Sequence, residues 1–253
     1  MVTDATPSSL REFFDRVGDV DVSLVTINRQ KPKPVQELLR NAFDAQSLDL
    51  VERSLPTQDD LLALRKDGEI SAVSPLDEVM NSFLLVNGDR FQTGTKGFDD
   101  EVPAVLREMD ETLFDLRGYP SSNKEKLLLI LISRHIERLA YKAGTGTLRS
   151  TFQRLSRLED ELGTRTVYER IAGRTVDVHV YGVPDRVPSQ LDVTVHTGTS
   201  DEYRNSWCVM FRPPGDGGAA LLAHQHESNR WQGFWTYDSE MIAQVDRYID
   251  RAF

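Results

Sequence analysis

Residues 121–140 read SSNKEKLLLILISRHIERLA, and this stretch decides the fold of the second half of the chain. Ser122 and Glu125 form a capping-box pattern, which predicts a helix that begins there and continues to Gly144. Its apolar residues cover more than one helical face, and they are Leu127, Leu128, Ile130, Leu131, Ile132, Ile136 and Leu139. Because such a helix must be buried on several sides, we expect it to be the central helix of the fold.

The residues after this helix predict a sheet. TLRSTFQR, from Thr147, alternates like a strand, whereas SRLEDELGTRTVYERIA, from Ser156, has helical spacing and a stop at Gly173. Five further segments are typical of strands, namely VDVHVYG, LDVTVH, WCVMFR, AALLAHQ and WQGFWTY. The last helix is expected over 239–252.

The first half predicts a smaller set of alternating elements. A short helix follows Ser9, a buried strand covers 20–27, and Pro34 suits the first turn of a helix to about residue 45. LDLVER, residues 48–53, is typical of a strand, and LLALRKDGEISAV, residues 61–73, is typical of a hairpin that turns at Asp67-Gly68. A helix after Ser74, a loop over 87–101, a helix over 102–109 and a strand over 112–117 complete this half.

These elements predict a mixed α/β (α+β) fold. We expect a mixed sheet in the C-terminal half around the central helix, with a smaller N-terminal α/β part packed on it. The expected modules are 1–118 and 119–253, and the candidate hinge between them is RGYPSSN, residues 117–123.

The composition is acidic and poor in lysine. The 253 residues carry 40 Asp plus Glu against 30 Lys plus Arg, for a net charge of −10, and only 7 of the basic residues are Lys. Because molar salt screens repulsion between carboxylates, such a surface suits the cytoplasm of a halophilic archaeon. An ordinary acidic protein from a GC-rich genome would show the same preference for Arg.

Other features point to a reducing cytoplasm. Cys208 is the single cysteine, which excludes an intramolecular disulfide. The longest apolar run, 127–132, is too short to span a bilayer, and the amino terminus lacks the pattern of a signal peptide. We therefore expect a soluble cytoplasmic protein without contact to a membrane.

Catalytic and metal-binding motifs are weak. His224 and His226 share one face of a predicted strand, but a third ligand is not evident, so we interpret them as surface or packing residues. GTGT, from Gly144, lacks the lysine of a phosphate loop and is better explained as a helix stop. The sequence predicts neither an enzyme nor a cofactor.

Three strings resemble the DICT sensory domain. They are SSNKEKLLLILISRHIERLA from Ser121, GTLRSTFQRLSRLEDELGTRTVYERIA from Gly146, and SWCVMFRPPGDGGAALLAHQHESNRWQGFWTYDSEMIAQVDRYI from Ser206. The whole chain also resembles haloarchaeal DICT-containing proteins. The resemblance implies an input module of signalling proteins, which senses a signal without catalysis, and it supplies no agreed ligand.

An aromatic and polar set in these strings is the candidate ligand site. Aromatic walls with a guanidinium group would hold a flat or anionic small molecule by stacking and bidentate hydrogen bonds. The predicted ligand-binding residues are Phe152, Gln153, Arg157, Tyr168, Trp207, Phe211 and Trp235. The alternative is that these large aromatic residues form the core.

Two functions follow from this interpretation. In the first, the chain senses a small molecule or another signal and passes it to a signalling or regulatory protein partner. In the second, it is a protein–protein adaptor with no ligand. A transcription regulator is a further alternative, but basic and acidic residues are interleaved and a helix-turn-helix pair is not evident, so we expect no direct nucleic-acid binding.

Overall fold

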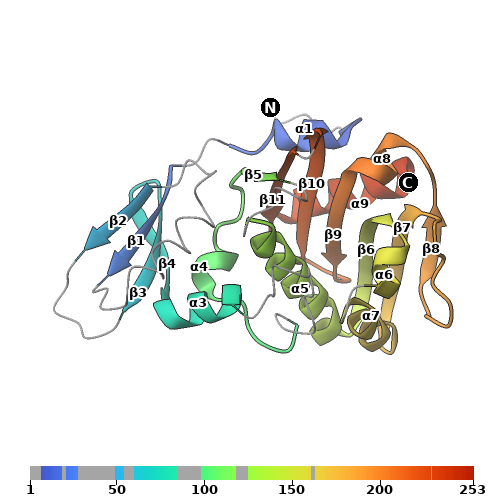
Figure 1. Ribbon diagram of the computed structural model, residues 1–253, viewed down its shortest axis with the longest axis horizontal. Coiled ribbons are helices and arrows are strands. Elements are labelled where there is room, and N and C mark those ends of the chain that lie inside the picture. The colour runs from blue at the N-terminus through green and yellow to red at the C-terminus, as the bar shows by residue number, and fades with distance from the viewer. Residues whose placement is uncertain are drawn as a thin grey trace.

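The chain builds two sheets of unequal size. The computed structural model describes residues 7–18, 21–27, 49–53, 60–84, 98–117, 125–160, 163–228 and 230–253. Within them lie a four-stranded sheet, in the order β2-β1-β3-β4, and a seven-stranded sheet, in the order β5-β11-β10-β9-β6-β7-β8. Figure 1 shows the smaller sheet at one end of the molecule, with α3 and α4 between it and α5.

The smaller sheet is built by the first half of the chain. The elements of this half are α1 (Leu10–Phe14), β1 (Val22–Ile27), β2 (Asp49–Arg53), β3 (Leu61–Lys66), β4 (Glu69–Pro75), α3 (Leu76–Leu84) and α4 (Ala104–Arg107). β1 pairs parallel with β2 and antiparallel with β3. Asp67 and Gly68 join β3 to β4 with φ angles of 49° and 89°, as a tight hairpin turn requires.

The larger sheet is mixed. Its strands are β5 (Phe114–Arg117), β6 (Thr145–Arg154), β7 (Thr175–Val183), β8 (Thr194–Thr197), β9 (Ser206–Arg212), β10 (Ala219–Glu227) and β11 (Arg230–Thr236). The helices of this half are α5 (Glu125–Ala143), α6 (Ser156–Asp160), α7 (Thr164–Ala172), α8 (Asp201–Asn205) and α9 (Ser239–Ala252). The pairs β6–β7 and β7–β8 are parallel, and the other pairs are antiparallel.

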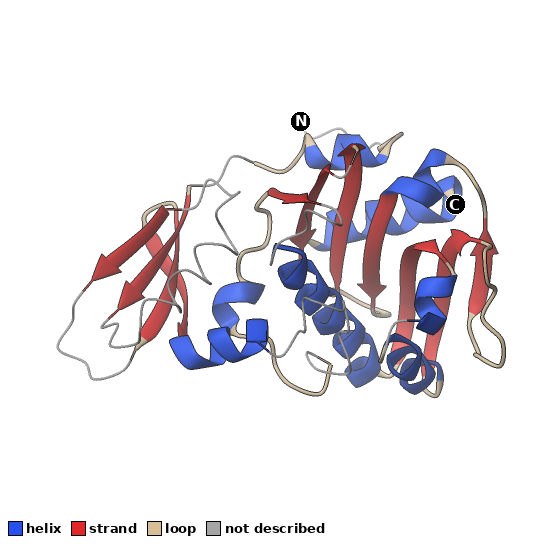
Figure 2. Ribbon diagram, viewed as in Figure 1, coloured by secondary structure: helices blue, strands red, loops and turns tan. Residues whose placement is uncertain are grey.

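Helices cover both faces of the larger sheet (Figure 2). α5 packs on one face, against buried strand residues such as Leu148, Val209 and Leu221. α1 and α9 pack on the other face, where Leu222 and Phe234 belong to a second apolar cluster. Since strand side chains alternate between faces, each strand supplies both clusters.

α5 is buried along most of its length. Leu129, Ile132, Ile136 and Ala140 have no exposed surface. The helix also comes close to β11, where a Cβ at Gly233 would lie 3.1 Å from the Leu129 Cδ1 atom. The buried residues of α3 and α4 join the same cluster, so the smaller sheet and α5 share one continuous core.

The fold predicted from the sequence is confirmed. The structure is a mixed α/β chain with a large mixed sheet in the C-terminal half, and the ambiguous segment after α5 is a strand followed by two helices. Gly144 ends α5 with a φ of 68°, which confirms the predicted helix stop. The helix predicted over 34–45 and most of the loop predicted over 87–101 lie outside the described residues.

The modules predicted as 1–118 and 119–253 stay a prediction. β5 falls on the N-terminal side of that boundary, yet it pairs with β11 and therefore belongs to the larger sheet. Among the described residues, no helix is long and apolar enough to cross a membrane.

Candidate functional site

Two of the predicted ligand residues meet inside the molecule. The rings of Phe152 and Tyr168 pack edge to face, with centroids 5.5 Å apart and planes at 68°. Tyr168 is fully buried, and its hydroxyl donates to Ser150 Oγ at 2.5 Å. Burial, reinforced by the carboxylate of Glu137, raises the pKa of Tyr168 well above its ordinary value. In this structure the Tyr168 side chain is a core residue with its polar atom satisfied.

The other predicted residues are spread over the sheet. Gln153 is buried and donates to the Ser206 carbonyl at 3.2 Å, whereas Trp207 is half-buried and Arg157 is exposed. Phe211 is buried in the cluster beneath α5.

Trp235 lies on a different part of the sheet. Its ring stacks on Phe114 at 5.1 Å, and its Nε1 donates to the Arg107 carbonyl at 2.9 Å. Ligand binding by the seven residues stays a prediction. The structure brings together only Phe152 and Tyr168 in a direct ring contact.

A cavity of about 430 Å³ lies elsewhere, between α1 and the ends of β5, β10 and β11. Mostly polar side chains line this space, which we call the α1 cavity: Arg11, Phe14, Asp115, His224, His226, Glu227 and Gln232. None of them belongs to the predicted ligand set, although His224 and His226 stood out in the sequence as residues on one strand face. No sequence motif indicates Asp115 and Gln232 as site residues, because it is the register between strands that brings them to the cavity.

The floor of the α1 cavity is a row of polar residues across three strands. His224 on β10 lies opposite Gln232 on β11, and Gln232 lies opposite Asp115 on β5. Directly opposed residues on neighbouring strands have Cβ atoms about 4.5–5.5 Å apart, so these three side chains are neighbours on one face. Phe14 closes one side of the space, and its ring packs edge-on against Phe234 at 5.1 Å.

His224 is the unusual member of this row. Its Nδ1 atom is buried and has no hydrogen-bond partner among the described residues. Burial, and then the neighbouring His226, lower the pKa of His224, so the neutral imidazole predominates at neutral pH. A buried ring nitrogen without a partner costs free energy. Because Nδ1 has almost no accessible surface, it is not itself presented to the cavity.

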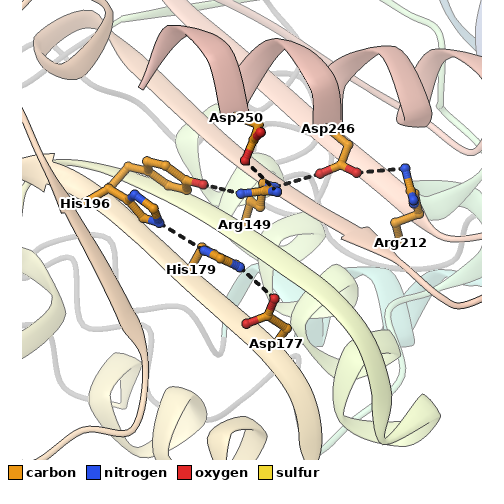
Figure 3. Close-up of polar contacts among 8 residues, drawn as sticks. Arg149, Asp177, His179, His196, Arg212, Asp246 and Asp250 are labelled. Carbon is orange, nitrogen blue, oxygen red and sulfur yellow. Dashed lines mark hydrogen bonds and ion pairs between the residues drawn. The ribbon is translucent and has the colours of Figure 1, made fainter.

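A second polar cluster fastens α9 to the sheet (Figure 3). Arg149 on β6 donates from Nε to Asp246 Oδ1 at 2.6 Å, and its Nη2 lies 3.1 Å from Asp250 Oδ1. The Nη1 atom donates to the Tyr181 hydroxyl. Arg212 adds a 2.8 Å ion pair to the other oxygen of Asp246. We call these five residues the α9 clamp.

The α9 clamp continues into a pair of histidines. His179 Nδ1 lies 2.9 Å from His196 Nε2, and His179 Nε2 lies 2.9 Å from Asp177 Oδ2. The His196 ring stacks on Tyr181, with centroids 4.3 Å apart. Burial, and then His179 and Arg149, lower the pKa of His196. The neutral His196 therefore suits the acceptor side of the hydrogen bond between the rings.

No motif in the sequence indicates that His179 and His196 converge, because the pairing of β7 with β8 brings them together. In the part of the chain that the structure describes, no group of three or more His, Cys, Asp or Glu residues is placed to hold a metal ion.

A comparison with protein families found one whose model matches part of the chain. Residues 103–226 match the family model described as DICT, a sensory domain in diguanylate cyclases and two-component systems. This segment runs from α4 into β10 and includes α5, Arg149, His179, His196, His224 and His226. A comparison with curated proteins found no match.

The solved structures that match the chain include one enzyme at low identity. Polyphosphate kinase from Porphyromonas gingivalis is 13% identical, with a TM-score of 0.34, and the match covers 98% of this chain and 49% of the kinase chain. The chain therefore spans about half the length of that kinase. A similarity at this TM-score carries no conclusion about fold or function.

Proposed function

We propose that the chain is a non-enzymatic sensory protein of the cytoplasm, which binds a small polar molecule in the α1 cavity and passes its state to a signalling partner. The match of residues 103–226 to a sensory domain favours the sensory role. The observation that favours the α1 cavity as the input is its polar floor, where His224, Gln232 and Asp115 lie side by side on three strands.

α1 offers a physical route from the cavity to the rest of the molecule. Its residues Arg11 and Phe14 line the cavity, while Phe13 packs edge-on against Tyr248 of α9, with centroids 5.6 Å apart. Arg251 of α9 also donates to the Pro7 carbonyl at 2.7 Å. A ligand that repositions α1 would therefore change the packing of α9.

The proposed relay ends at α9. Its polar side is held by the α9 clamp, and its exposed residues include Glu240, Arg247 and Asp250. A partner that contacts this helix would respond to a change in its position. Such coupling requires that the ligand bind one arrangement of α1 and α9 more tightly than another.

The adaptor alternative predicts a different outcome in one experiment. The full chain is captured from its native cells, and bound small molecules and proteins are identified by mass spectrometry. The sensory proposal predicts a small molecule whose recovery falls in the variant His224→Leu, and a partner whose recovery depends on that molecule. A partner recovered equally with wild type and His224→Leu, and no retained small molecule, would favour the adaptor.

A further inference from the structure

The α1 cavity brings together polar side chains of both charge signs. Arg11, His226 and Gln232 supply hydrogen-bond donors, whereas Asp115 and Glu227 supply carboxylate acceptors. Elsewhere on the same sheet face, Arg149 and Arg212 form ion pairs with carboxylates of the protein itself. Donors and acceptors gathered around one space favour a molecule with several polar atoms.

Arg11 determines the charge of one end of that molecule. It is exposed on α1, with its guanidinium free to present two parallel N–H groups to the cavity. This fork matches a carboxylate, which it binds by paired charge-assisted hydrogen bonds. His226 and Gln232 add further donors, so one pole of the cavity favours an anionic group.

Asp115 and Glu227 determine what the other end can be. Glu227 lies 3.6 Å from Arg230, but both side chains remain largely exposed, so its carboxylate still faces solvent. Asp115 has partners of its own and stands in the polar row beside Gln232. Two carboxylates repel a second anionic group and accept hydrogen bonds from hydroxyl or ammonium groups.

The size of the space fits a small metabolite. A volume of about 430 Å³ lies at the lower end of the range typical of ligand pockets, roughly 300–1,000 Å³. Phe14 is the aromatic residue of the lining, and it is itself 5% exposed, so it offers little area for stacking. The lining therefore suits a compact polar molecule better than a flat aromatic one.

Resting on the proposed function, we infer that the α1 cavity binds a small organic acid that also carries hydroxyl or amino groups. The carboxylate lies against Arg11, with His226 and Gln232 as further donors. The hydroxyl or ammonium group lies toward Asp115 and Glu227. His224, which also lines the floor, lies in the same polar row.

A titration of the full chain with four probes tests this inference. Lactate and alanine carry one carboxylate with a hydroxyl or an ammonium group, propionate carries the carboxylate alone, and glycerol carries hydroxyl groups without a carboxylate. The inference predicts heat of binding or a thermal shift with lactate or alanine and weaker effects with propionate and glycerol. Comparing lactate with alanine distinguishes a hydroxy acid from an amino acid.

The variant Arg11→Met removes the fork without disturbing the core, because Arg11 is exposed. Its affinity for the acid that binds should fall about tenfold or more, as expected for the loss of a charge-assisted hydrogen bond. The matched control is Arg204→Met, an exposed arginine of α8 whose Nε donates to the Thr199 carbonyl at 3.0 Å, and it should leave the affinity unchanged. Unliganded thermal midpoints confirm that both variants fold.

Three results would overturn the inference. They are no binding of lactate or alanine, equal binding of glycerol, or an Arg11→Met affinity within about twofold of wild type. A neutral molecule that copurifies with wild type but not with His224→Leu would refute the organic-acid inference and leave the sensory proposal standing. Conversely, tight binding of an acid with no effect on partner recovery would refute the relay and leave the ligand class standing.

Discussion

At the residue scale, α5 carries an ion pair where its apolar surroundings predict none. The Nη1 atom of Arg134 lies 2.5 Å from Glu137 Oε2, and the two side chains are only 5% and 3% exposed. The Nη2 atom of Arg134 donates to Thr164 Oγ1 at 2.6 Å, which connects α5 to α7. Burying both charges is tolerable because each has close polar partners.

Breaking this pair should be costly. Glu137→Ala leaves the Arg134 charge buried without its carboxylate, so the free energy of unfolding should fall by about 3–5 kcal/mol. Urea denaturation measures the loss. The apolar double variant Arg134→Met with Glu137→Leu should cost less than Glu137→Ala alone. A single variant as stable as wild type would show that water reaches the pair.

His135, the neighbour of this pair on α5, should make stability depend on pH. Burial, and then Arg107 and Arg138, lower the pKa of His135 to about 4. The unfolded chain binds a proton near pH 6.5, so this contribution is present above pH 6.5 and is lost as the pH falls toward 4. The difference corresponds to about 3 kcal/mol.

His135→Gln tests this dependence against wild type. The variant should lose less stability than wild type between pH 6.5 and pH 4.5, in urea denaturation series at each pH. Because other groups titrate in the same range, only the difference between the two proteins is assigned to His135. Parallel pH profiles for the two proteins would contradict the assignment.

At the element scale, α5 should be the helix whose truncation damages the whole fold. Leu128, Ile132 and Ile136 are at most 3% exposed, so each change to Ala should cost about 2–5 kcal/mol. Leu139→Ala, on the same helix but only partly buried, is the matched control with a smaller loss. Denaturation midpoints of the variants measure these losses. If the triple Ala variant of Leu128, Ile132 and Ile136 is nearly as stable as wild type, α5 is a peripheral element.

α9 should depend on its clamp. Arg149→Met removes the contacts to Asp246, Asp250 and Tyr181, and should cost about 2–4 kcal/mol with faster amide exchange in α9. Arg212→Met removes only the contact to Asp246 from a side chain that is 46% exposed, and should cost less. Equal exchange rates in α9 for wild type and Arg149→Met would show that the α9 clamp does not hold this helix.

The sequence predicted these elements better than it predicted the site. Hydrophobic periodicity, Asp67-Gly68 and Gly144 are local signals, and the structure confirms the elements that they mark. The polar row of His224, Gln232 and Asp115 depends on which strands become neighbours and in what register. Register between strands far apart in the chain leaves no local pattern, so the α1 cavity could not be predicted.

The sequence also could not show whether the predicted aromatic ligand residues form a pocket or the core. Large aromatic residues at alternating positions fit a pocket wall and a core equally well, and burial decides between them. Tyr168 and Trp235 have no exposed surface, whereas Arg157 is exposed. Composition alone predicted none of these differences.

At the scale of the whole molecule, the net charge of −10 predicts a dependence on salt. Screening of repulsion between carboxylates should raise the unfolding midpoint as salt increases toward the molar range. Thermal unfolding of the full chain across salt concentrations measures this effect. A midpoint that is the same at very low and molar salt would contradict the expected adaptation to a salty cytoplasm.

We propose that a ligand in the α1 cavity acts on α9 through α1. Hydrogen–deuterium exchange of the full chain, with and without the small-molecule extract of its native cells, measures this coupling. Exchange should slow in α1, β10, β11 and α9 with the extract, and should not change in His224→Leu. Protection confined to the Phe152 and Tyr168 region, or no protection at all, would contradict it.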